Sequence, residues 1–160
     1  MKKNGKDTDV VPVGRLLTAG TVSLDLKGQT KLEVIDELVG ILDAAGLLTD
    51  KGAVRQAVIE RERKLSTGLE NGVAVPHGKS NGVNRLVAAF GIKKKGLYFD
   101  SADGRPAHLF FMLVSPETIS GPHIRALASI AKFMNTAGNR ERLMKATGQE
   151  DVLKICEDMT

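Results

Sequence analysis

Three histidines are the side chains of this sequence best suited to group-transfer chemistry near neutral pH. The chain has 160 residues, with histidines at positions 77, 108 and 123 and a single cysteine, Cys156. A neutral imidazole is a competent nucleophile, and its two nitrogens can divide the work of attack and orientation. Each histidine is therefore either a candidate site residue or a residue with an ordinary structural role.

His77 lies in the stretch GVAVPHGKS, which is close to a phosphate-binding loop without being one. A P-loop has the pattern G-x-x-x-x-G-K-[ST], whereas five residues separate Gly72 from Gly78 here. Pro76 cannot donate to a sheet ladder, so we expect a strand over 73–75 to end there. His77 would then project into the loop that follows. An ordinary loop histidine is the alternative that spacing alone favours.

His123 and His108 occupy different kinds of segment. His123 follows Pro122 in the first turn of a helix expected to begin at Ser120, where proline is well tolerated. The free N–H groups and partial positive charge of such an N-terminus disfavour protonation of a histidine and favour a nearby anion. Taken alone, His123 is more often a surface residue. His108 lies in the apolar segment 107–115, which favours a structural role in or near the core.

A helix expected after Asp50, running to about Lys64, carries an arginine on its apolar stripe. The positions at i, i+4, i+7 and i+11 are Val54, Val58, Arg61 and Leu65. Arg61 either extends its guanidinium outward from the helix end or points into a site that holds an anion. Arg63 and Lys64 lie off the stripe and are expected to face water.

Other catalytic chemistries lack their usual sequence patterns. A zinc site would need closely spaced ligands such as H-E-x-x-H or clustered cysteines, and neither is present. A G-x-S-x-G nucleophile turn is also missing. A metal site would therefore have to be assembled from residues that are distant in the sequence.

The elements that must position these residues mix helices and short strands. We expect strands over 21–26, 73–75, 86–92, 96–99 and 107–115. We expect one helix after the capping box of Thr30 and Glu33 and a second after Asp50. A third is expected from Ser120, and two short ones over 139–147 and 149–157. The apolar residues of the third that recur at helical spacing are Ile124, Leu127, Ala128, Ala131 and Met134. This order predicts an α/β fold, a single domain with a central mixed β-sheet flanked by helices on both faces. The domain would span 11–160, after a flexible N-terminal tail of residues 1–10.

Composition limits the classes of partner. The net charge of +4 and the pI near 9.3 suggest nucleic-acid binding, but basic nucleic-acid binders usually add stacking aromatics, and only 4% of residues are aromatic. Lysines at 2, 3 and 6 fall in the expected tail, and the run at 93–95 is expected to be a solvated turn. We therefore expect no nucleic-acid partner, although a basic nucleic-acid-binding domain stays as an alternative.

The apolar runs, such as LFFMLV, are too short to cross a bilayer, and the N-terminal stretch has no apolar core of a signal peptide. One cysteine excludes an internal disulfide and is compatible with a reducing compartment. A cytoplasmic protein without membrane insertion is expected.

The stretch RERKLSTGLENGVAVPHGKS resembles the type-2 enzyme IIA domain of the bacterial phosphoenolpyruvate:sugar phosphotransferase system. The family pattern runs RE, then STG, then an apolar stretch ending in PH, which correspond here to Arg61-Glu62, 66–68 and 73–77. The likeness continues through FDSADGRPAHLFFMLVSPE and HIRALASIAKF, where Ile124 replaces the usual leucine. It thus covers nearly the whole chain after the tail, and it looks closest to the stand-alone nitrogen-regulatory branch.

The resemblance implies a phosphotransferase that works through a phosphohistidine. The family accepts a phosphoryl group on Nε2 of the PH histidine, here His77, from the small carrier HPr, which is charged from phosphoenolpyruvate by enzyme I. The second active-site histidine corresponds to His123 and the RE arginine to Arg61. Thr67 and the backbone amide of Gly78 are weaker candidates for binding the phosphoryl group. The resemblance implies no metal and no other cofactor.

Two uses of that phosphoryl group stay open. A transport component would pass it to an enzyme IIB, whereas a regulatory module of the nitrogen-regulatory type would use it as a switch that changes its protein targets.

Overall fold

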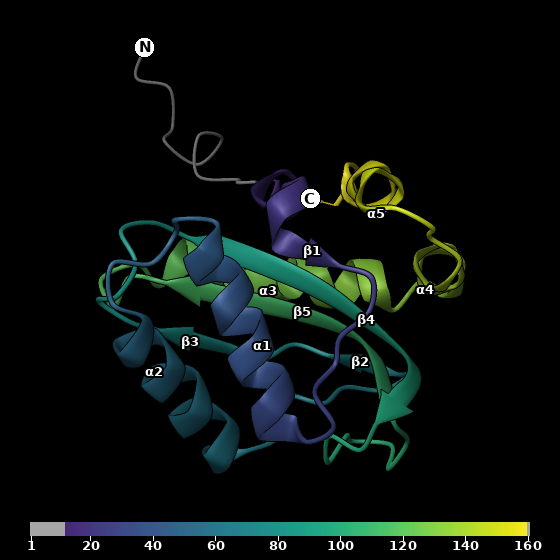
Figure 1. Cartoon of the computed structure of the whole chain (residues 1–160), viewed down its shortest axis with the longest axis horizontal. Helices are drawn as coiled ribbons and strands as arrows, with labels where there is room; N and C mark the ends of the chain where they lie inside the picture. The colour runs from purple at the N-terminus through teal and green to yellow at the C-terminus, as the bar shows by residue number, and fades with distance from the viewer. Residues whose placement is uncertain (1–11, 160) are drawn as a thin grey trace.

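A five-stranded mixed sheet lies between two helical layers in the computed structural model, which describes residues 12–159 (Figure 1). The strands are β1 (Val22–Ser23), β2 (Val73–Ala74), β3 (His77–Lys79), β4 (Val87–Leu97) and β5 (Ala107–Ser115). Their order is β1-β4-β5-β2, and β3 also pairs with β5. Only the β4–β5 pair is antiparallel among these pairings. The predicted fold class is confirmed.

The helices divide between the two faces of the sheet. One face carries α1 (Lys31–Ala44) and α2 (Lys51–Lys64). In Figure 1, α1 crosses the front of the sheet and α2 lies at the lower left, next to β3. The other face carries α3 (Gly121–Met134), α4 (Ala137–Met144), α5 (Gln149–Cys156) and the 3-10 segment Val13–Leu16, with a second 3-10 segment at Ala19–Thr21 leading into β1. The last two helices were expected over 139–147 and 149–157, so their existence is confirmed and their ends are shifted.

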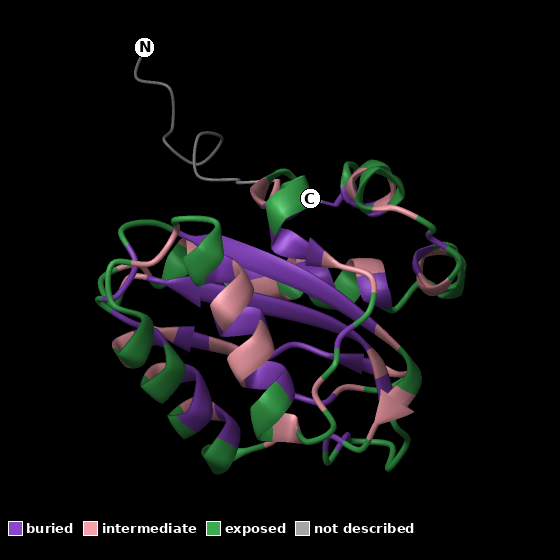
Figure 2. Ribbon diagram, viewed as in Figure 1, coloured by how far each residue is buried: buried purple, intermediate pink, exposed green. Residues whose placement is uncertain are grey.

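Strand β5 is buried on both faces and divides the core in two. Phe110, Met112 and Val114 pack with the α1 and α2 side, whereas Leu109 and Phe111 pack with the α3 side. This alternation explains why the sequence of the segment is almost wholly apolar. The buried band runs along β4 and β5 through the centre of the molecule (Figure 2).

Both N-terminal helices begin where their capping residues predict. The Thr30 hydroxyl accepts a hydrogen bond from the Glu33 amide, and the Glu33 carboxylate accepts one from the Thr30 amide, which completes the capping box. The Asp50 carboxylate accepts from the Ala53 amide at 3.0 Å. These local contacts fix the start of α1 and of α2, the helix that carries Arg61.

The expectation that His77 lies in a loop is wrong. Residues His77–Lys79 form β3, parallel to β5, with His77 opposite Leu113. Pro76 does interrupt the strand, as its missing N–H predicts, but its carbonyl oxygen accepts from the Leu113 amide at 3.1 Å and so continues the ladder. His77 is therefore held on a sheet strand by β5.

Other strand boundaries also differ from the predictions. The strand expected over 21–26 is only Val22–Ser23, and the segments 86–92 and 96–99 belong largely to one strand, β4, that continues through the lysines at 93–95. The expected turn at those lysines is therefore wrong. The register with β5 shifts between Ile92 and Leu97, a stretch that includes Gly96 with φ +75°, and pairing resumes past the lysines with Leu97 opposite Ala107. The predicted tail, 1–10, lies outside the described residues.

No helix within residues 12–159 is both long enough and apolar enough to cross a membrane.

Candidate active site

A pocket of about 710 Å³ opens where α2, β3 and the start of α3 meet. It collects four of the residues predicted for the site, namely Arg61, His77, Gly78 and His123. These residues come from three elements separated widely in the sequence, so the fold and not local spacing brings them together. Gly78 lies where β3 meets α2, and a side chain there would approach the backbone of Ala57 and Val58 within 3.1–3.2 Å.

His77 is oriented by a backbone carbonyl group. Its Nδ1 lies 2.7 Å from the carbonyl oxygen of Val75. Because a carbonyl oxygen only accepts hydrogen bonds, Nδ1 carries the proton, and Nε2 of the neutral ring holds the free lone pair. The ring is half-buried, and burial lowers the pKa of His77. The hydrogen bond to Val75 raises this pKa and the Arg61 guanidinium lowers it, and the net shift is downward.

His123 lies beside His77, with ring centroids 5.8 Å apart and ring planes tilted by 56°. It occupies the first turn of α3 behind Ser120, where the sequence predicts it, but only 5% of its surface is exposed, so the surface interpretation is wrong. Its Nδ1 lies 2.6 Å from the Ser115 hydroxyl oxygen. Burial, with added repulsion from His77 and Lys79, lowers the pKa of His123 to about 4, so the ring is neutral at neutral pH.

Arg61 lies at the edge of the pocket near the end of α2. Its Nη1 donates to the carbonyl oxygen of Leu65 at 2.7 Å, an interaction that holds the guanidinium against the helix end. The predicted apolar stripe is partly wrong, because Leu65 lies past the helix and is 71% exposed. Arg63 is exposed as expected, whereas the exposed Lys64 also lines the pocket.

Glu62, which the sequence reasoning missed, is the charged residue buried on α2. Its carboxylate accepts from Lys31 Nζ at 2.9 Å and from the Thr67 amide at 3.0 Å, and it also accepts from the Thr67 hydroxyl. Thr67 is therefore bound to Glu62 and is not among the described residues that line the pocket. The i, i+4, i+8 spacing of Val54, Val58 and Glu62 is the sequence pattern that could have revealed it.

Lys79 is a second residue that the sequence reasoning passed over. It follows His77 by two positions on β3, so both side chains project from the same face of the strand. Its Nζ donates to the Ser120 hydroxyl at 2.8 Å, and the side chain lines the pocket. The pocket is thus lined by two cations from α2, Arg61 and Lys64, and one from β3, Lys79. Two carboxylates, Glu60 and Glu117, also line it, so the excess of charge is positive and suited to an anion.

His108 lies near the opposite end of β5 from Ser115. It is half-buried, and its Nδ1 lies 3.1 Å from the carbonyl oxygen of Lys94. This agrees with the structural role that the sequence favours. Residues 12–159 contain no cluster of three or more His, Cys, Asp or Glu side chains placed to hold a metal ion.

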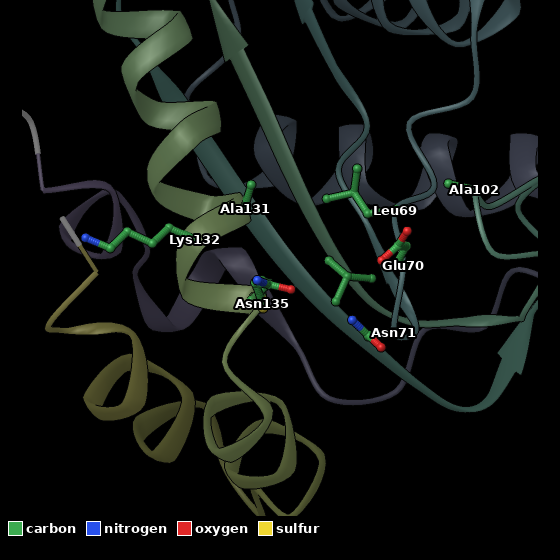
Figure 3. Close-up of a pocket in the computed structure, with 9 residues that line it drawn as sticks. Leu69, Glu70, Asn71, Ala102, Ala131, Lys132 and Asn135 are labelled. Atoms are coloured by element: carbon green, nitrogen blue, oxygen red, sulfur yellow. The ribbon is translucent and has the colours of Figure 1, made fainter.

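A separate depression of about 480 Å³ lies between residues 69–73 and the C-terminal part of α3 (Figure 3). Glu70, Asn71, Lys132 and Asn135 supply its polar groups. It is at the end of α3 opposite to His123, and it contains neither a histidine nor an arginine among its described lining residues. The residues with nucleophilic and anion-binding chemistry therefore gather in the pocket of His77.

The fold is that of a phosphotransferase-system IIA domain. The chain belongs to the family described as phosphoenolpyruvate-dependent sugar phosphotransferase system, EIIA 2, whose model matches residues 15–159. The predicted family is confirmed. Proteins of this family are phosphotransferases that relay phosphoryl groups.

Relatives carry two kinds of name. The chain is 36% identical over 143 residues to the fructose-specific EIIABC component of Bacillus subtilis, covering 89% of this chain but 22% of that protein, so it spans about a fifth of this relative. It is 27% identical over 150 residues to a nitrogen regulatory protein of Pseudomonas aeruginosa, covering 94% and 97% of the two chains.

Solved structures with this fold carry a nitrogen-regulatory name and a mannitol name. Nitrogen regulatory protein IIA-Ntr from Neisseria meningitidis superposes with a TM-score of 0.83 at 31% identity, covering 91% of this chain and 99% of the other. IIA mannitol from Escherichia coli superposes with a TM-score of 0.76 at 25% identity, covering 88% and 98%.

Proposed function

We propose that this protein carries a phosphoryl group on Nε2 of His77. The hydrogen bond from Nδ1 to the Val75 carbonyl supports this proposal most directly, because it leaves the Nε2 lone pair free in a pocket that three cations line. The lowered pKa of His77 acts in the same direction, since it keeps the ring unprotonated at neutral pH.

The transfer step needs positioning and charge stabilisation more than covalent machinery. Nε2 attacks phosphorus in line with the bond to the donor, that bond breaks, and its electron pair stays on the donor. The proton on Nδ1 remains in its hydrogen bond to Val75. Arg61 and Lys79 stabilise the negative charge of the phosphoryl oxygens, and the N-terminus of α3 at His123 adds N–H donors. No metal or other cofactor takes part in this step.

The proposed donor is phospho-HPr in the cytoplasm, charged from phosphoenolpyruvate through enzyme I. The recipient is either an enzyme IIB or, in the regulatory alternative, no further acceptor, with the phosphoryl group controlling which protein targets bind. The fructose-specific relative favours the first output, and the relatives named as nitrogen regulatory proteins favour the second.

Labelling from phosphoenolpyruvate tests the acceptor. With enzyme I and HPr present, we expect the wild type and His108→Ala to take up one phosphoryl group and His77→Ala to take up none. The bond should be labile in acid and stable in base, as a phosphoramidate is. Stoichiometric label on His77→Ala, or label mapped to His108, would refute the assignment.

Onward transfer separates the two outputs. After labelling, purified enzyme IIB and its sugar are added, and the label remaining on the protein is followed over time. A transport component passes the label on to enzyme IIB, whereas a purely regulatory module retains it.

A further inference from the structure

The two histidines of the pocket use the same ring atom for different partners. Nδ1 of His77 meets a carbonyl oxygen, whereas Nδ1 of His123 meets the hydroxyl of Ser115 at 2.6 Å. A carbonyl can only accept a hydrogen bond, but a hydroxyl can donate or accept one. The partner of His77 therefore fixes its tautomer, and the partner of His123 permits either.

The task of His123 decides between its two tautomers. To donate a hydrogen bond to a phosphoryl oxygen on His77, its pocket-facing nitrogen must carry the proton. Nδ1 is directed to Ser115, which leaves Nε2 for the pocket. A neutral ring has one proton, so Nδ1 must then be the acceptor, and Ser115 must be its donor.

We infer that Ser115 is a positioning residue: its hydroxyl donates to Nδ1 of His123 and so keeps the proton on Nε2, aimed at the phosphoryl group of His77. This inference rests on the proposed function for its purpose. The neighbouring histidines then hold opposite tautomers, one with a free lone pair for attack and one with a free N–H for charge stabilisation.

Ser115 is well placed for this role. It is the last residue of β5 and is fully buried, so water does not compete for its hydroxyl. Its carbonyl oxygen accepts from the Ser80 amide at 2.9 Å, and its backbone pairs with Lys79 on β3. The same sheet ladder therefore positions Ser115 and the strand of His77.

The hydroxyl also suits a protonated His123 ring. If the dianionic phosphoryl group draws a second proton onto His123, the Ser115 hydroxyl can turn and accept a hydrogen bond from Nδ1–H.

The tautomer is measured directly by ¹⁵N-detected NMR of the imidazole rings in the full, unphosphorylated chain. The three histidines give few signals, and His77→Ala, His108→Ala and His123→Gln assign them. We expect Nδ1–H for His77 and Nε2–H for His123 at neutral pH. An Nδ1–H tautomer of His123 in the wild type would overturn the inference.

Two substitutions of equal shape isolate the hydroxyl. Ser115→Thr keeps it and Ser115→Val removes it, so any effect of added volume is common to both. We expect Ser115→Thr to retain the Nε2–H tautomer and Ser115→Val to lose its predominance. Transfer from phospho-HPr should be roughly two- to tenfold slower in Ser115→Val than in Ser115→Thr. Equal tautomers and equal rates in the pair would show that the hydroxyl has no such role.

Failure of the proposed function gives a different result. A wild type that has Nε2–H on His123 but takes no label from phospho-HPr would refute the carrier assignment, since the tautomer is read before any transfer.

Discussion

His77 and His123 lie with their ring centroids 5.8 Å apart, on β3 and α3, two elements that both contact β5. Their ring nitrogens are engaged in a complementary way, since each Nδ1 is bound away from the pocket. The pair therefore presents two Nε2 atoms to one space, which is the geometry expected if one ring receives an anion and the other stabilises it.

Arg61→Ala should slow transfer from phospho-HPr about ten- to a hundredfold, because a charge-assisted hydrogen bond contributes about 1.5–3 kcal/mol. Rapid-quench kinetics measures the rate, and circular dichroism checks that α2 survives loss of the contact with Leu65. Arg63→Ala is the matched control, because Arg63 is exposed on the same helix. If both variants transfer at the wild-type rate, Arg61 does not stabilise the phosphoryl group.

His123→Ala should fold and still accept a phosphoryl group, but about ten- to a hundredfold more slowly in at least one direction. His123→Gln, whose amide can place an N–H near the original Nε2, should recover part of the loss. The two variants are compared in forward transfer from phospho-HPr and in the reverse reaction. Equal rates for wild type and His123→Ala in both directions would mean that His77 works without it.

The fold should lose stability in mild acid through His123. Its folded pKa of about 4 lies below the ordinary value of 6.5, so the unfolded chain takes up the proton first. The contribution is present above about pH 6.5 and is lost as the pH falls toward 4, and the lowered pKa of His77 acts in the same direction.

The matching measurement is the free energy of urea unfolding. Between about pH 7 and about pH 5, the wild type should lose about 2 kcal/mol more than His123→Gln. The same pH dependence in both proteins would show that the pKa of His123 is not lowered in the folded state.

Glu62→Ala should lower the free energy of unfolding by about 3 kcal/mol, because it leaves the buried donors of Thr67 unpaired and removes one partner of Lys31. Lys31 retains its second ion pair, with Asp100, which limits the loss. Glu60→Ala, an exposed change on the same helix, should alter stability by less than about 0.5 kcal/mol. If the two variants lose similar amounts of unfolding free energy, the buried ion pair of Lys31 and Glu62 contributes little to stability.

The sequence predicted those features that depend on neighbouring residues. The capping box of Thr30 and Glu33 and the cap at Asp50 act over three or four positions, so they place α1 and α2 correctly. The family motifs likewise named Arg61, His77 and His123, which the fold collects in one pocket.

Features set by pairing across the chain were not predictable in the same way. Two of the three residues of β3, Gly78 and Lys79, are of types depleted in strands, so the pairing with β5 decides their conformation. In α3 the predicted apolar face included Ile124, which is 64% exposed, while His123 is buried. Apolar spacing cannot distinguish a residue that packs in the core from one left at the rim of a site.

The placement of His77 on the sheet has a consequence for how the family can diversify. The backbone of a residue on the β3–β5 ladder is held by the core strands, so its position depends on the fold more than on the surface around it. Exposed side chains at the end of α2 and on α3, such as those of Leu65 just past α2 and Ile124 on α3, carry no such constraint. On the proposed function, recognition of a docking partner can therefore change over evolution while the position of His77 on the sheet is kept.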